Sequence, residues 1–195
     1  WELSDGTRLT AGTTATNTLS SAGFDPVAFD PITGFSSAPT VLSQSQTSSG
    51  PDWITTRIGN VSSSGFELAM QQEEALNGGF HAMETIGWLA IASGAASDGD
   101  TLLEARTTDA SVDHTADTVP FSQSFSGTPA LISKLASYRG PDPANLRVSA
   151  VRPGSFEALV HEERSADAEI GHIPEAVGFL ALDGRSGTLS GVGID

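Results

Sequence analysis

The feature that most constrains this chain is an internal repeat. At an offset of 90 residues, Phe35 matches Phe125, Pro39 matches Pro129, Arg57 matches Arg147 and Glu73 matches Glu163. After a one-residue insertion the offset is 91, so that His81 matches His172, Glu84 matches Glu175 and Gly87 matches Gly178. This period is longer than that of solenoid repeats, and the chain is long enough for two domains of about 100 residues. We therefore predict two tandem domains, residues 1–97 and 98–195.

The local sequence pattern indicates antiparallel β-structure throughout both copies. Short runs such as TVLSQSQ, WITTRIGNV and FELAMQ are separated by the turn sequences SSGPD, SSSG and LNGG. In residues 65–71, alternation places Phe66, Leu68 and Met70 on one face of a strand. The runs TIGWLAI and AVGFLAL are apolar on both faces, as in central strands. The predicted fold is all-β, with two β-sandwiches of about six strands, whose first strands lie near residues 1–7 and 101–107.

The composition excludes several classes of partner and site. The chain has 24 acidic and 9 basic residues, no cysteine and a formal net charge of −15. A uniformly acidic protein repels phosphate backbones and anionic lipids, so we predict neither a nucleic acid nor a membrane partner. Without cysteine there is neither a disulfide framework nor a thiolate metal site. We also expect a soluble chain, because no apolar run is long enough to span a bilayer. Neutral polysaccharides and glycans meet no such electrostatic penalty.

The acidic residues do not suggest an enzyme. Glu73 and Glu74 are adjacent, so on a strand they point to opposite faces, and Glu74 is replaced by Arg164 in the second copy. The His81-x-x-Glu84 spacing would suit a metal on a helix, but here it places the histidine in a loop and the glutamate at the start of the last strand. We therefore predict no catalytic residues, no metal and no cofactor.

Two interpretations of the repeated polar residues stay open. In the first, Gln44, Gln46, Arg57, Glu67 and Gln71 share a sheet face that reads sugar hydroxyls, beside an aromatic ring near the Gly-Pro-Asp turn. In the second, the repeated glutamate pairs with the repeated arginine and fixes a loop. The candidate ligand-binding residues are Gln46, Asp52, Trp53, Arg57, Gln71, His81 and Glu84 in the first copy, and Tyr138, Asp142, Arg147, His161, His172 and Glu175 in the second.

Residues 57–68 read R-I-x-N-V-x-x-x-G-F-E-L and residues 84–91 read E-T-I-G-W-L-A-I. This order resembles H-type lectin domains over residues 35–91 and, more weakly, over residues 125–182. The sequence also resembles a module found in tandem in secreted bacterial proteins. The resemblance implies a six-stranded antiparallel sandwich that binds galactose-type sugars, often as a trimer with sites between subunits. The positions that it implies for sugar contact are Arg57, His81 and Trp88, with Arg147, His172 and Phe179 in the second copy.

From these observations we predict a non-catalytic carbohydrate-binding tandem module of an extracellular bacterial protein. Its expected partner is a polysaccharide or glycan, and assembly into a homo-oligomer is left open. The alternative is a structural spacer or assembly module of a secreted protein or adhesin, without a sugar ligand. In that case the repeated His, Glu and Arg residues would only hold loops in place.

Overall fold

The computed structural model describes residues 1–76, 79–98 and 101–183, and it confirms the all-β antiparallel sandwich fold. The only helical elements in these ranges are two 3-10 turns, η1 (Pro31–Thr33) and η2 (Glu74–Leu76). The strands are β1 (Leu9–Thr16), β2 (Asp25–Ala28), β3 (Thr40–Ser45), β4 (Ile54–Ser62), β5 (Gly65–Gln72), β6 (Glu84–Ile91), β7 (Gly94–Asp98), β8 (Thr101–Thr107), β9 (Asp117–Pro120), β10 (Ala130–Leu135), β11 (Ala144–Arg152), β12 (Ser155–Glu162) and β13 (Val177–Leu182).

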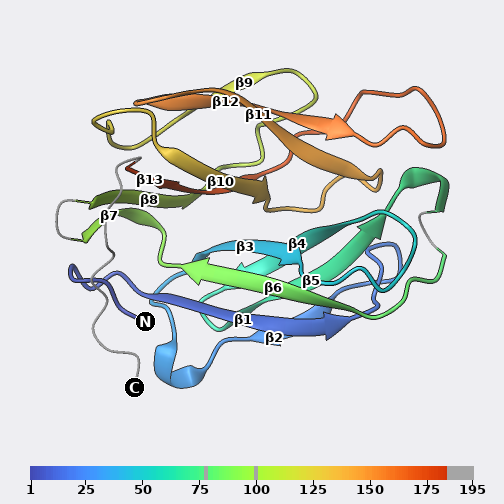
Figure 1. Cartoon of the computed structure of the whole chain (residues 1–195), viewed down its shortest axis with the longest axis horizontal. Coiled ribbons are helices and arrows are strands. Elements are labelled where there is room, and N and C mark those ends of the chain that lie inside the picture. Colours follow the sequence, from blue (N-terminus) through green and yellow to red (C-terminus); the bar gives the residue numbers. More distant parts are fainter. Residues whose placement is uncertain (77–78, 99–100, 184–195) are drawn as a thin grey trace.

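The strands form four antiparallel sheets, two in each half of the chain (Figure 1). In the first half the orders are β1-β6-β3 and β2-β5-β4. In the second half they are β10-β13-β8-β7 and β11-β12-β9, which is the same order of equivalent strands with β7 added at one edge. Because β7 pairs with β8, the predicted domain boundary after residue 97 falls inside a strand of the second half.

The first strand of the first copy was predicted wrongly. It lies at Leu9–Thr16 and not near residues 1–7, whereas the equivalent strand of the second copy, β8, lies where it was predicted. Residues 3–7 turn back on themselves, because the N–H of Leu3 donates to the carbonyl of Thr7 at 2.9 Å and Gly6 adopts a φ of 87°. A positive φ is typical of a turn and not of an extended strand, and glycine adopts it without steric cost.

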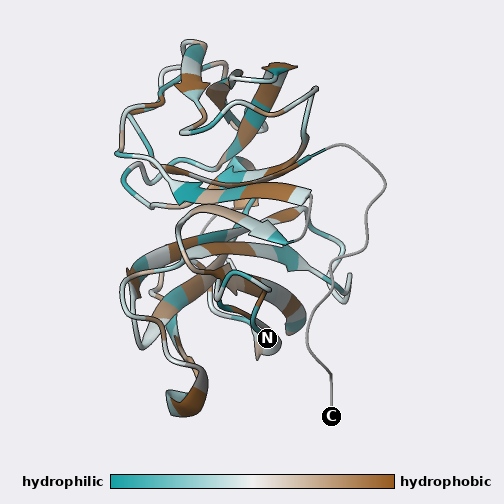
Figure 2. Ribbon diagram, turned by 90° about the vertical axis from the view of Figure 1, so that its left-hand side faces the viewer, coloured by the Kyte–Doolittle hydropathy of each residue, from teal (hydrophilic) through white to brown (hydrophobic). Residues whose placement is uncertain are grey.

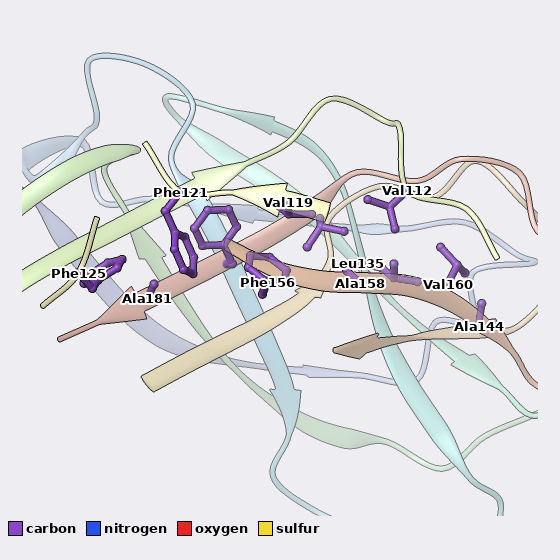
Figure 3. Close-up of a cluster of buried hydrophobic side chains, with 12 residues drawn as sticks. Val112, Val119, Phe121, Phe125, Leu135, Ala144, Phe156, Ala158, Val160 and Ala181 are labelled. Atoms are coloured by element: carbon purple, nitrogen blue, oxygen red, sulfur yellow. The ribbon is translucent and has the colours of Figure 1, made fainter. Parts of the chain in front are cut away.

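Each sandwich has its own apolar core, formed by side chains that alternate along its strands. Phe66, Leu68 and Met70 are buried in the first core, as alternation predicted. The aromatic rings of the second core, part of which Figure 3 shows, pack mainly edge to face, with ring centroids 5.3 Å apart for Phe156 and Phe179. The two aromatic sets are Phe29, Phe35, Phe66 and Trp88 in the first core and Phe121, Phe125, Phe156 and Phe179 in the second.

A β-bulge recurs at the same place in both halves. Asn60 in β4 and Ala150 in β11 both have a φ of 48°, where the register of each hairpin shifts. Asparagine tolerates this left-handed conformation, whereas alanine pays for the contact between its Cβ and the following carbonyl. We therefore expect Ala150→Gly to raise the free energy of unfolding by about 0.5 to 1 kcal/mol. Urea unfolding of both chains measures this, and a less stable variant would contradict the prediction.

The two halves pack against each other along one seam (Figure 1), and the view in Figure 2, turned by 90°, shows the same stacking of the two sets of strands. The seam joins the outward face of sheet β1-β6-β3 to the outward face of sheet β10-β13-β8-β7. Burial of this second face explains why β6 and β13 are apolar on both sides. The apolar side chains of the seam include Leu42, Leu89, Ile91, Leu103, Ala105, Leu180 and Leu182.

Candidate functional site

Glu84, the first residue of β6, holds the loop between β3 and β4. Its carboxylate accepts hydrogen bonds from the backbone N–H groups of Ser49 at 2.6 Å and Gly50 at 3.1 Å, and from the hydroxyl of Thr47. Burial raises the pKa of Glu84, but the hydrogen bonds from Thr47, Gly50 and Ser49 outweigh this effect, so the pKa lies below its usual value. The residue therefore serves as an ionised anchor for a loop.

His81 completes this anchor from the loop position that the sequence predicted. The ring is buried, and its Nδ1 donates to the carbonyl of Ala82 at 2.8 Å. The ring lies so close to Gly50 that a Cβ there would come within 2.7 Å of it. His172 and Gly140 repeat the arrangement in the second half, where the corresponding distance is 2.6 Å. The repeated Gly-Pro-Asp and His-x-x-Glu sequences thus form one structural unit.

Glu175 holds the equivalent loop of the second half and also binds the first half. Its Oε1 accepts hydrogen bonds from the N–H groups of Arg139 at 2.9 Å and Gly140 at 3.3 Å. The same oxygen forms an ion pair with Nη2 of Arg57 at 2.8 Å, and both side chains are completely buried. The predicted pairing of the repeated glutamate with the repeated arginine therefore exists between copies and not within one.

Further contacts hold the guanidinium of Arg57, a residue of the first half, against the second half. Its terminal nitrogens donate to the carbonyl oxygens of Ser137 at 3.1 Å and Ala144 at 3.4 Å. The guanidinium carbon lies 5.3 Å from the ring centroid of Tyr138, within the range of a cation–π contact. Arg57 and Tyr138, both predicted to bind a ligand, thus contact each other at the seam.

The predicted sugar-reading face does not form as one open surface. Arg57 and Gln71 do share a face of sheet β2-β5-β4, but both are fully buried, and Nε2 of Gln71 donates to the carbonyl of Pro141 at 3.0 Å. Gln44 lies on β3 and Gln46 directly follows it, so they extend the other sheet of the sandwich. The prediction failed because alternation identifies the polar face of a strand but not the half of the chain that covers it.

A groove of about 480 Å³ opens where the two halves meet. It lies on the outward face of β11 and β12, and the equivalent face of β4 and β5 in the first half carries the buried Arg57. Trp53 is 40% exposed there, and the Arg147 side chain is also exposed. We call this site the Trp53–Arg147 groove. It is lined by Trp53 and Glu73 from the first half and by Asn145, Arg147, His161, Glu162, Glu163 and Arg164 from the second.

The carboxylates of the groove differ in their environments. Burial raises the pKa of Glu163, but the hydrogen bonds that it accepts from Ser165 and from the N–H of Glu74, the latter at 2.6 Å, lower the pKa below its usual value. Glu163 thus stays ionised while it ties the two halves together. Burial raises the pKa of Glu162, whose side chain is largely shielded from solvent and accepts no hydrogen bond among the described residues.

The structure brings three of the predicted ligand residues together in this groove, Trp53, Arg147 and His161. It places Trp88 and Phe179, the aromatic positions taken from the lectin resemblance, in the two cores. The prediction from the sequence did not include the other groove residues, among them Asn145, Glu163 and Arg164, because the groove forms only where the two halves meet. A usable signal was the difference between copies at equivalent positions, such as Gln71 and His161.

Comparison with known proteins adds one relative. The chain is 29% identical over 181 residues, 92% of its length, to a protein named Halomucin from Haloquadratum walsbyi (strain DSM 16790 / HBSQ001). The chain spans only 2% of the length of that relative. No protein-family model and no solved structure matches the chain. The similarity to Halomucin is compatible with an extracellular module.

Two further features are absent from the described part of the chain. None of its helices is long and apolar enough to cross a membrane. Nor do the residues that the structure describes contain a group of three or more His, Cys, Asp or Glu side chains placed to hold a metal ion.

Proposed function

We propose that the chain is a non-catalytic carbohydrate-binding module of an extracellular protein, and that the Trp53–Arg147 groove is its glycan site. The observation that supports this proposal is the combination of groups in the groove. An exposed indole offers a flat apolar surface on which a pyranose ring can stack. The guanidinium of Arg147 offers paired donors, and the carboxylate of Glu163 offers acceptors, for sugar hydroxyls.

The two copies are not equivalent as binding surfaces. Thr55, Arg57 and Gln71 are buried in the first copy, so no ligand can reach that face. Their counterparts Asn145, Arg147 and His161 are at least partly exposed. The proposal therefore assigns one glycan site to each chain, even though the sandwich fold is repeated. Its wall at Trp53 comes from the first half, so a lone second half would have an incomplete site.

The charge of the site favours neutral sugars. The chain carries a net charge of −15, and in the groove itself the carboxylates of Glu73 and Glu163 offset the positive charges of Arg147 and Arg164. Sulfated or uronic sugars would meet repulsion from these carboxylates, whereas hydroxyl groups would not. The resemblance to H-type lectin domains suggests galactose-type sugars within this neutral class.

Trp53→Ala and Arg147→Ala are each expected to weaken glycan binding by roughly tenfold or more, which corresponds to about 1.4 kcal/mol. A glycan array identifies the ligand, and isothermal titration measures its affinity and its stoichiometry of one per chain. Arg152→Ala is the matched control, because this exposed arginine lies at the end of the same strand and outside the groove. Unchanged affinity in the Trp53 variant, or no neutral glycan bound at millimolar concentration, would refute the proposal.

A structural module without a sugar ligand is the second candidate, and the buried Arg57–Glu175 pair favours it. This pair and the apolar seam hold the two sandwiches in one fixed arrangement, as a spacer requires. The same titration separates the two candidates. If neutral glycans fail to bind, the repeated polar residues serve only to fix the loops and the seam.

A further inference from the structure

The seam contains the only lysine of the chain, Lys134 on β10. Its Nζ donates to the hydroxyl of Thr55 in the opposite half at 3.0 Å. Among the residues that the structure describes, no carboxylate oxygen lies within ion-pair distance of this nitrogen, and Arg57 is the charged group that acts on it. Lys134 is therefore a half-buried cation without a carboxylate partner.

The charges around Lys134 do not balance. Arg57 and Lys134 supply two positive charges, whereas the ion pair across the seam supplies one carboxylate, that of Glu175. The Nε of Arg57 is also buried without a hydrogen-bond acceptor. Burial and the repulsion from Arg57 lower the pKa of Lys134 to about 8, so most of its population is still protonated at pH 7. Charged groups that are largely withdrawn from solvent are normally paired.

A pocket of about 300 Å³ opens beside this lysine, between the two halves. Its walls combine the apolar side chains of Leu42, Leu89 and Ile132 with the polar side chains of Gln44, Gln46 and Lys134. Side-chain amides donate hydrogen bonds to an anion. The pocket is open to solvent at Gln44, Gln46 and Ile132, so an anion can enter it. The pocket does not share any lining residue with the Trp53–Arg147 groove.

We propose that the seam binds one monovalent anion, which the ammonium group of Lys134 holds with the side-chain amides of Gln44 and Gln46. Such an anion would neutralise the excess positive charge between the halves and stabilise their packing. Two sources share this chemistry, an inorganic halide and the carboxylate of a small organic ligand. The site is separate from the glycan groove, so the test of anion binding does not depend on the outcome of the test for glycan binding.

Thermal unfolding of the full chain tests this site, with sodium bromide, sodium acetate and sodium glucuronate added at constant sodium concentration. The expected result is a Tm that rises about 5 °C or more once the anion exceeds its Kd 100-fold. Lys134→Met is the control, because it keeps an unbranched side chain of nearly the same length and removes the charge, and its Tm should lack this increment. If only bromide raises the Tm, the site binds a halide. If only acetate or glucuronate raises it, the site binds a carboxylate.

The native chain supplies a second test without any substitution. At pH 9.5 Lys134 is largely neutral, so the anion-dependent rise in Tm should disappear, and the Tm without added anion should be higher than at pH 7. The unfolded lysine keeps its proton in this range while the folded one loses it, which favours the folded state. Equal responses of the native chain and the Lys134→Met variant to all three anions, or an undiminished response at pH 9.5, would overturn the proposal.

Discussion

Arg57→Ala is expected to lower the free energy of unfolding by about 3 to 5 kcal/mol, because it leaves the buried carboxylate of Glu175 without its partner. The carbonyl oxygens of Ser137 and Ala144 lose a donor in the same variant. Urea unfolding, followed by fluorescence of the tryptophans, measures the change. Most of the loss should arise at the seam, since the side chain of Arg57 extends out of its own core.

The repeat supplies a matched control for this experiment. Arg147→Ala removes the same side chain from the equivalent position of an equivalent strand, but at an exposed site. It is expected to change stability by less than about 0.5 kcal/mol. Combining Arg57→Ala with Glu175→Gln should recover part of the loss, because the remaining group carries no charge. Similar effects of the two arginine replacements would contradict the assignment of Arg57 to a buried pair across the seam.

This contrast also shows how much of the molecule the sequence could predict. Turn sequences and alternation were sufficient for the sandwich fold, for the inward side chains of β5 and for the position of Glu84 at the start of a strand. They could not distinguish Arg57 from Arg147, because both are arginines at the same position of equivalent strands, β4 and β11. Their burial differs because only one of the two faces is covered by the other half, and that depends on tertiary packing.

The missed first strand has a local cause. Residues 9–16 read LTAGTTAT, with small or polar residues at most positions, so they lack the apolar alternation that marks a strand. The strand forms because β6 pairs with it along its whole length, from Leu9 opposite Ile91 to Thr16 opposite Glu84. Gly12 is required within it, because a Cβ there would come within 2.5 Å of the Trp88 ring. Tertiary pairing thus outweighed weak local propensity.

Only part of the candidate groove could be predicted from the sequence, because its formation also depends on tertiary packing. Trp53, Arg147 and His161 were recognised as residue types that can bind a sugar, yet they come from different copies. Their meeting depends on contacts such as the hydrogen bond from the Thr55 hydroxyl to Oδ1 of Asn145 at 3.0 Å. The repeat explains the architecture of each half, whereas the contacts between halves create the differences between otherwise equivalent positions.

Gly140→Ala is expected to lower the free energy of unfolding by about 1 to 3 kcal/mol, because its Cβ would lie 2.6 Å from the buried ring of His172. Either the ring or the loop must shift, and the loop is the segment whose N–H groups hold Glu175 against Arg57. Gly127→Ala is the control, since no atom lies within 4 Å of the added carbon. Urea unfolding compares them, and a Gly140 variant as stable as the Gly127 variant would show that the contact with His172 does not constrain the loop.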